Sequence, residues 1–391
     1  MIQPTGGPNF VGRAMAEFRG SGTANKIFIG MLILTPLAVV ANYAGFPPLV
    51  IFAIAALAVV PLAKIMSDST ENLAHHVGPT IGGLLVATFG NAVELIIAIL
   101  ALFQGLTEVV KASITGSIIG NLLFVLGLSI FAGGLKFKTQ KFNRVGASAS
   151  ASQLVVAVIA LIIPAVFTNT LGGDLSQKSR DDLLENLSIL VAVILLICYA
   201  GQLVFFLFTH SDLAGENAEK HAPAEFTPEY AAAEEEGPVW SVTRAVITLI
   251  VATIVVGFVS EILVESIEPV TKQLGWTELF VGVILLAIVG NAAEYVASVT
   301  AAMKNRMNLS LNITTGASLQ MAFFVTPVLV FIGLISGNHL SLRFEEFELV
   351  CIIVAVVIVN FVSLDGESNW LEGLQLMGAY FIIAVAFFLH P

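Results

Sequence analysis

The sequence predicts an all-α membrane protein with eleven transmembrane helices, arranged as one N-terminal helix followed by two inverted repeats of five helices. Three observations support this prediction. The chain has 391 residues, of which 57% are hydrophobic and only 12% are charged, whereas soluble domains carry about 25% charged residues. Apolar segments long enough to cross a membrane recur along the whole chain. Two of these segments, 200 residues apart, share a polar motif.

Hydropathy and segment length place the expected spans in order along the chain. The spans are residues 27–44, 48–66, 79–104, 110–134, 145–167, 186–208, 241–263, 277–303, 309–334, 345–363 and 371–389. The first apolar segment starts only at Ile27 and is long enough to span, so no cleavable signal peptide is expected.

The spans define four segments of chain. These are an N-terminal segment with the first helix (1–46), a first five-helix repeat (47–208), an acidic linker (209–240) and a second, inverted five-helix repeat (241–391). The linker contains three consecutive glutamates at 234–236. Two interpretations of this tract stay open: a solvated connection, or a cytoplasmic acidic helix that gathers cations near the pore entrance.

The distribution of Lys and Arg predicts a cytoplasmic N-terminus and an external C-terminus. In this orientation twelve of the 17 basic residues fall in cytoplasmic segments and five in external ones. Cytoplasmic loops carry an excess of Lys and Arg, and the densest cluster here is Lys136, Lys138, Lys141 and Arg144. The short extension before the first span and the compact loops suit a prokaryotic cell membrane.

The two halves of the chain share a motif with a carboxylate in the middle of a span. The motif is Gly90-Asn91-Ala92-Val93-Glu94 in the first half and Gly290-Asn291-Ala292-Ala293-Glu294 in the second. Between 81 and 101, eight of 21 positions are identical to those 200 residues later. Since each repeat has five spans, the second must enter the membrane from the opposite side, and inverted repeats form their shared site near the midplane.

The motif residues supply oxygen ligands for a hard cation. A charged residue inside a span costs about 3 kcal/mol and by default marks an ion or proton pathway. Two facing carboxylates stay ionised together only if a cation or protons neutralise them. Asn91 and Asn291 add amide oxygens, and Gly90 and Gly290 permit close backbone approach or a helix break. Carboxylate, amide and carbonyl oxygens are the ligands that calcium prefers.

The following spans are expected to complete the site. Ser113, Ser117 and Asn121 recur every four residues and so share one helix face. Gly116 and Gly120 form a GxxxG pattern on an adjacent stripe, which favours close helix packing. In the second half Ser318 and Gln320 occupy the corresponding region, and we expect Asn121 and Gln320 to coordinate the cation or position the glutamates.

Other polar residues are expected to have no part in the site. His75 and His76, next to Glu71, are interpreted as an interfacial pair, with pH sensing as the alternative. Acidic residues near the outer ends of the seventh and tenth spans are expected to be solvated; they are Glu261, Glu265, Glu268, Glu345, Glu346 and Glu348. Cys198 and Cys351 lie inside spans and are expected to be inert packing residues.

These motifs resemble the two signature repeats of the calcium/proton exchanger family, within the cation/calcium exchanger superfamily. The resemblance includes residues 82–95, 111–113, 116–123, 290–294 and 316–320, the span layout and the acidic mid-chain loop. It implies that the paired glutamates bind calcium and exchange it for protons by alternating access. The implied site residues are Glu94, Glu294, Asn91, Asn291, Ser117, Asn121, Ser318 and Gln320. Many relatives have a histidine after the second glutamate; this chain has Tyr295, so a proton-relay role for that histidine does not transfer.

The sequence therefore favours a calcium/proton antiporter, with calcium and protons as substrates, membrane lipid around the spans and no cofactor. A sodium-coupled calcium exchanger and a cation channel remain as alternatives. An enzyme is not expected, because no nucleophile–base pair or metal-activating motif occurs at midplane depth. The net charge of −11 leaves no basic footprint for nucleic acid.

Overall fold

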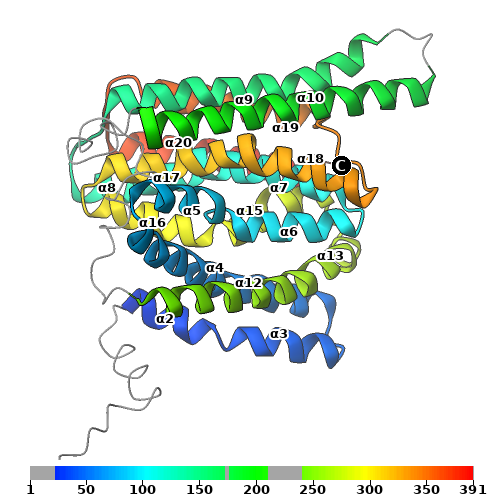
Figure 1. The fold of residues 1–391 in the computed structure, drawn as a ribbon, viewed down its shortest axis with the longest axis horizontal. Helices are drawn as coiled ribbons and strands as arrows, with labels where there is room; N and C mark the ends of the chain where they lie inside the picture. The colour runs from blue at the N-terminus through cyan, green and yellow to red at the C-terminus, as the bar shows by residue number, and fades with distance from the viewer. Residues whose placement is uncertain (1–22, 172–175, 210–239, 391) are drawn as a thin grey trace, which may run out of the picture.

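The computed structural model describes residues 23–171, 176–209 and 240–390, which form one bundle of long helices (Figure 1). The expected acidic tract at 234–236 lies outside the described residues, as does most of the linker around it. The first described helix, α2, begins at the end of the bundle drawn at the left of Figure 1, and the C-terminus lies toward the opposite end.

The helices follow the expected spans in chain order. The first half contains α2 (Thr23–Met31), α3 (Leu34–Tyr43), α4 (Pro48–Val77), α5 (Pro79–Phe89), α6 (Ala92–Phe103), α7 (Thr107–Ile119), the π-helical turn η1 (Gly120–Val125), α8 (Leu126–Lys136), α9 (Arg144–Thr170), α10 (Gln177–Val204) and η2 (Phe205–Thr209). The second half contains α12 (Val242–Glu265), α13 (Ile267–Leu274), α14 (Glu278–Phe280), η6 (Val281–Leu286), α15 (Ala287–Gly290), α16 (Ala292–Met303), α17 (Met307–Gln320), η7 (Met321–Val325), α18 (Thr326–Ser336), α19 (Glu346–Val362) and α20 (Trp370–Leu389).

The membrane class is confirmed by the length and composition of these helices. Among the described residues eight helices are long and apolar enough to cross a membrane, or ten if each of two bent helix pairs is one span. The expected span 345–363 corresponds to α19, which has 17 residues and lies at the short limit for a span. The count of eleven spans stays a prediction.

Two expected spans are longer than the hydropathy pattern indicates. The span expected at 48–66 is α4, a helix of 30 residues that continues to Val77. Its polar second half stays helical because side chains one turn apart pair: Lys64 with Asp68 at 2.5 Å, and the hydroxyl of Ser67 with the Glu71 carboxylate at 3.0 Å. Likewise α10 begins at Gln177 rather than 186, after Ser176, whose side chain accepts a hydrogen bond from the Ser179 amide.

The 200-residue offset of the sequence recurs in the helix geometry. The break between α5 and α6 corresponds to the break between α15 and α16. The π-helical turns η1 and η7 directly continue α7 and α17, after Ile119 and Gln320, at corresponding places in the two halves. π-helical turns occur often at functional sites, and here they lie in the two helices that pack beside the breaks.

The broken helices lie in the middle of the bundle. Helix α4 packs against α12 and α3 along one side, and α9 packs against α10 and α19 along the other (Figure 1). Helices α7, α8, α16 and α17 lie between these two groups. At one end, the two-residue strands β1 (Gln140–Lys141) and β2 (Glu367–Ser368) pair antiparallel and join the segments before α9 and α20.

Close helix packing accounts for the GxxxG pattern. A Cβ atom at Gly116 would lie 2.0 Å from the carbonyl oxygen of Val283, and one at Gly120 would lie 3.3 Å from the hydroxyl of Tyr295. The prediction of close approach at these glycines is confirmed.

The expectation that Glu348 is solvated is wrong. The residue is 1% exposed, and its carboxylate accepts a hydrogen bond from the Thr115 hydroxyl at 2.8 Å and one from the Glu345 amide at 2.9 Å. It is both the third residue of α19, where it caps the helix, and a polar link between α19 and α7. By contrast Glu261, Glu265 and Glu268 are exposed, as expected.

The two cysteines differ from each other. Cys351 is buried, in agreement with the expected packing role, whereas Cys198 is exposed on α10. An exposed residue in an apolar helix of a membrane protein faces lipid rather than the core, so the packing expectation is wrong for Cys198.

Candidate functional site

Each signature glutamate lies just after a break in a bent helix pair. The bend is 41° between α5 and α6 and 61° between α15 and α16. Asn91 and Asn291 are the residues at these breaks, and Glu94 and Glu294 are in the first turn of the helix that follows. The positive end of a helix dipole favours a negative charge in that first turn. Discontinuous helices of this kind bind ions in many transporters.

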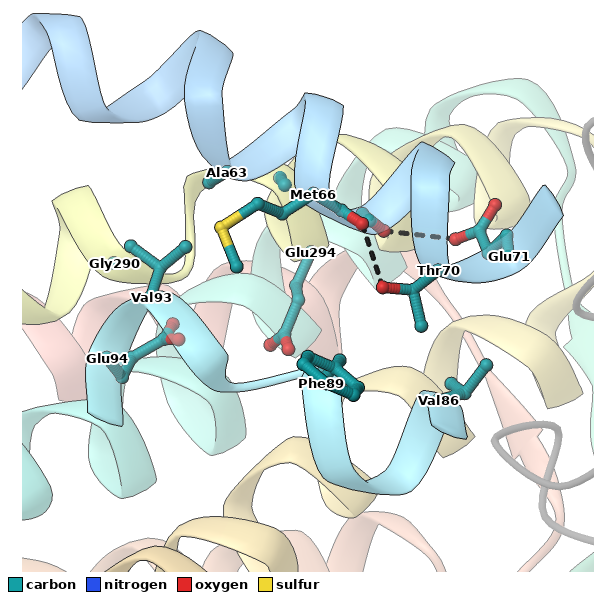
Figure 2. A pocket seen from close by; sticks show the side chains of 13 residues that line it. Ala63, Met66, Thr70, Glu71, Val86, Phe89, Val93, Glu94, Gly290 and Glu294 are labelled. Carbon is teal, nitrogen blue, oxygen red and sulfur yellow. Dashed lines mark hydrogen bonds between the residues drawn. The ribbon is translucent and has the colours of Figure 1, made fainter. Parts of the chain in front are cut away.

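Both glutamates line one cavity. Its volume is about 40 Å³, which is enough for a few waters, because one water requires about 10–15 Å³ on this measure. Figure 2 shows the carboxylates of Glu94 and Glu294 below α4, with Gly290 on one side and Phe89 on the other. Gly90 also lines the cavity. Four of the ten predicted site residues are therefore brought together around one space.

Gly290 leaves the space that Glu94 occupies. A Cβ atom at this position would lie 2.9 Å from Cγ and 3.1 Å from Oε1 of Glu94. Real Cβ atoms essentially never come so close, so the glutamate of the first half packs directly on the break of the second half. Only glycine permits this approach.

The other six predicted residues do not line the cavity. Most of them form hydrogen bonds with one another around the two breaks. The amide group of Asn91 donates to Oε1 of Gln320 at 2.8 Å. The amide group of Asn121 donates to Oδ1 of Asn291 at 3.0 Å, and that of Asn291 donates to the Ser117 hydroxyl at 3.1 Å. Each of these hydrogen bonds joins one half of the chain to the other.

Ser318 has a weaker connection to the site. Its hydroxyl donates to the carbonyl oxygen of Thr314 in its own helix at 2.9 Å and to that of Ile118 at 3.5 Å. It thus contacts α7 of the other half, but no hydrogen bond joins it to the predicted amides or carboxylates in the described part of the chain.

Two buried amide oxygens, one at the first break and one in η1, are available for a further ligand. Oδ1 of Asn91 and Oδ1 of Asn121 are buried and accept no hydrogen bond from the described residues. A buried acceptor without a donor costs about 1–3 kcal/mol. A cation or a water at this place would remove that cost.

Glu71 is a residue of this site that the sequence interpretation missed. It is buried, and it lines the same cavity as the two signature glutamates, on α4 (Figure 2). The signal was present in the sequence as polar residues at four-residue spacing after Lys64. It was missed because the span was expected to end at residue 66, which placed Glu71 outside the membrane.

The histidines next to Glu71 do not line the cavity. His75 and His76 are exposed in the last turn of α4. The ring Nε2 of His76 lies 2.6 Å from the carbonyl oxygen of Trp240, and the amide of Trp240 donates to Oδ1 of Asn72 at 2.8 Å. These contacts fix the beginning of the second half to the end of α4, which is consistent with an interfacial position.

Tyr295, the residue that follows the second signature glutamate, does not line the cavity. Its hydroxyl donates to the carbonyl oxygen of Ala287 at 3.3 Å, and its ring lies edge-on to Phe124 with centroids 6.0 Å apart. The position is filled by a packing residue in this chain.

The donor set is oxygen-rich but contains few charges. Within the described ranges no group of three or more His, Cys, Asp or Glu side chains is arranged to hold a metal ion. A cation between Glu94 and Glu294 would therefore need amide, hydroxyl, carbonyl or water oxygens as well.

Together the fold and this arrangement define a polytopic membrane protein of the ion-transporter class, with two broken helices that meet at paired carboxylates. The chain belongs to the sodium/calcium exchanger protein family, whose model matches residues 47–208 and 244–389.

Individual relatives are similar over nearly their whole length. A Ca²⁺/H⁺ antiporter of Synechocystis is 47% identical over 375 residues, which cover 94% of this chain and 99% of the relative. The Ca²⁺/H⁺ antiporter ChaA of Bacillus subtilis is 44% identical over 367 residues, with 93% and 99% covered. A crystal structure of the Ca²⁺/H⁺ antiporter protein YfkE is 40% identical and has a TM-score of 0.77, with 93% of this chain and 99% of that chain covered.

Proposed function

We propose that this protein is a secondary active antiporter that exchanges calcium for protons across the membrane. The observation that carries the proposal is the pair of carboxylates, Glu94 and Glu294, in one cavity at the breaks of two corresponding helices. The choice of ions is supported by relatives named as Ca²⁺/H⁺ antiporters, which are 44–47% identical to this chain over more than 90% of its length.

The carboxylates bind calcium or protons, but not both together. Two ionised carboxylates in a space of this size repel each other unless a positive charge lies between them. One calcium ion supplies that charge, and protonation of the carboxylates removes the need for it. Because each ligand displaces the other, calcium moves one way only when protons move the other way.

The amide groups around the breaks do not line the cavity and form a second layer around the proposed calcium site. Oδ1 of Asn91 and Oδ1 of Asn121 accept no hydrogen bond from the described residues, and each suits a water that in turn binds a hard cation. Ser117, Asn291 and Gln320 hold the breaks in position through their hydrogen bonds, whereas Ser318 links α17 to α7. No cofactor takes part, and no covalent bond is made, so the protein is a transporter and not an enzyme.

Alternation of access follows from the inverted repeat. The two five-helix units, 47–208 and 241–391, cross the membrane in opposite directions and meet at the cavity. With the N-terminus in the cytoplasm, the cavity extends from the glutamates along α4 toward Glu71 and the cytoplasmic end of that helix. In a prokaryotic cell membrane this arrangement exports calcium as protons enter.

Calcium uptake into proteoliposomes tests the function. We expect uptake when the lumen is more acidic than the medium and sodium is absent, and loss of uptake when an ionophore collapses the pH gradient. A lower external pH should weaken calcium binding, because protons compete for the same carboxylates. Uptake that requires a sodium gradient would contradict proton coupling, and flux without any gradient coupling would indicate a channel.

A further inference from the structure

Glu348 is a buried carboxylate that the proposed exchange does not use. It lies in the first turn of α19, at the external end of that helix in the orientation given above. Its two oxygens each accept one hydrogen bond, from the Thr115 hydroxyl at 2.8 Å and from the Glu345 amide at 2.9 Å. Two uncharged donors therefore hold this side chain between α19 and α7.

Helix capping does not account for this position. Glu372 caps α20 in the same way, since its carboxylate accepts a hydrogen bond from the Asn369 amide at 3.2 Å. Yet Glu372 is only partly buried, and no other helix of the described chain donates to it. A cap thus needs neither full burial nor a donor from a neighbouring helix, and Glu348 has both.

Within the described residues no Lys, Arg or His forms an ion pair with Glu348. The charge of Lys111, one turn before Thr115 on α7, acts on Glu348 through space, but its ammonium group pairs with Glu108 at 2.9 Å. A buried carboxylate that lacks an ion-pair partner bears a desolvation cost when it is ionised, and a proton removes that cost. Glu348 is therefore a group that can bind and release a proton.

Few titratable groups surround this carboxylate in the described part of the chain. They are Lys111 of α7, Glu345 and Cys351 of α19, and His390 after α20, whose ring stacks on Phe347 with centroids 5.3 Å apart. Helix α9 and the turn η1 also pack on α19, and neither brings a titratable residue to this end. Of the two acidic side chains here, Glu345 is exposed and only Glu348 is buried.

Thr115 connects Glu348 to the central site. It is two residues before Ser117 on α7, which corresponds to about 3 Å along the helix axis. The Ser117 hydroxyl accepts a hydrogen bond from the amide group of Asn291, the residue at the second break. In the other direction α7 leads to Glu108, which is exposed. Glu348 thus lies between the external surface and the break that carries Glu294.

We propose that Glu348 is a proton-binding residue on the external side of the exchange pathway, and this inference rests on the function proposed above. A proton from outside binds the ionised carboxylate of Glu348. It passes to Glu94 or Glu294 when the site opens to the outside and calcium leaves, and Glu348 returns to its ionised form. Each proton that enters this carboxylate also leaves it, so charge and protons balance.

Two exchange reactions in the same proteoliposomes test the proposal. Calcium/proton exchange is measured as uptake into an acidic lumen. Calcium/calcium exchange is measured as uptake of radioactive calcium against unlabelled calcium at equal pH, and it needs no net movement of protons. We expect Glu348→Gln to lower calcium/proton exchange by about a hundredfold, as for the loss of a positioned proton-transfer group, and to keep calcium/calcium exchange at the native rate.

The matched control is Glu372→Gln, which changes the capping glutamate of α20 in the same way. It should keep both reactions. Loss of both reactions in Glu348→Gln would show a structural role, and retention of both would show no role; either result would overturn the proposal. Absence of calcium/proton exchange in the native chain would instead overturn the proposed function.

Thr115→Val provides a second test, which holds even if Glu348→Gln does not fold. This variant keeps the carboxyl of Glu348 and removes one of its two donors. Because the protonation of a carboxyl depends on the groups that donate to it, the lumenal pH at which exchange is half-maximal should change. Thr315→Val, at the corresponding place in α17, should leave that pH as in the native chain. The same pH dependence in both variants would overturn the proposal.

Discussion

Glu94 and Glu294 occupy equivalent places in the two halves, and neither is redundant in the proposed exchange. Replacement of either by Gln keeps the shape of the side chain but removes one negative charge and one proton-binding group. We therefore expect Glu94→Gln and Glu294→Gln each to lose calcium/proton exchange in proteoliposomes. The exposed Glu265 of α12 provides the control, since Glu265→Gln should exchange at the native rate. Full activity in either signature variant would contradict the central-site model.

Substitution of Gly290 by Ala adds one carbon atom where the two halves meet and so tests this contact. The added Cβ of Gly290→Ala would lie 2.9 Å from Cγ of Glu94, and overpacking of this kind costs about 1–3 kcal/mol. We expect calcium affinity in the exchange assay to fall by about tenfold, in line with such a cost. Gly257→Ala is the matched control, because nothing lies within 4 Å of a Cβ there. Equal affinity in both variants would show that Glu94 does not depend on this space.

The elements of the fold were predictable where apolar runs are unbroken, and less so where polar residues continue a helix. The spans around α9, α12, α18 and α20 follow the hydropathy pattern. The second half of α4 does not follow it. A hydropathy pattern assigns polar residues to a loop, whereas here pairs such as Lys64–Asp68 stabilise them in a helix. That error hid Glu71. Spacing predicted that Gly90 and Asn91 lie near Glu94, but it could not reveal that the side chain of Asn91 donates to Gln320 across the repeats.

Glu348 shows how burial depends on a neighbouring element. Three acidic residues at the start of α19 look alike in sequence, yet only Glu348 of the three is buried, since Thr115 on α7 donates to it. Thr115→Val would leave this carboxylate without that donor, and we expect a loss of about 1–3 kcal/mol of stability. Thermal unfolding of the purified protein measures it.

The equivalent residue of the second half supplies the control for this link. The Thr315 hydroxyl donates to the carbonyl oxygen of Leu311 in its own helix at 2.8 Å. Thr315→Val therefore leaves no buried charge without a donor and should cost less, about 0.5–1.5 kcal/mol. If the two variants lose the same stability, the hydrogen bond between α7 and α19 contributes no more than the hydrogen bond of Thr315 within its own helix.

For the whole molecule, the direction of transport depends on which end of the bundle faces the cytoplasm. The cavity of the two glutamates involves the half of α4 that leads to Val77. The basic residues that predict the cytoplasmic side include Lys138 and Lys304. They lie in loops that are expected on the same side of the membrane as Val77. Helix α9 then carries the chain across: its 27 residues span about 40 Å, at 1.5 Å per residue, so Lys138 before it and Lys178 after it are expected on opposite sides of the membrane.

Accessibility of single cysteines to a membrane-impermeant thiol reagent tests this orientation. The variants Lys138→Cys and Lys178→Cys are made with Cys198→Ser, since Cys198 is exposed whereas Cys351 is buried. Both new positions are themselves exposed. In intact cells we expect labelling at 178 only, and at 138 only after the membrane is permeabilised. Labelling of both in intact cells would contradict a crossing by α9. The reverse pattern would show the opposite orientation in the membrane, in which the glutamates of this conformation are reached from outside.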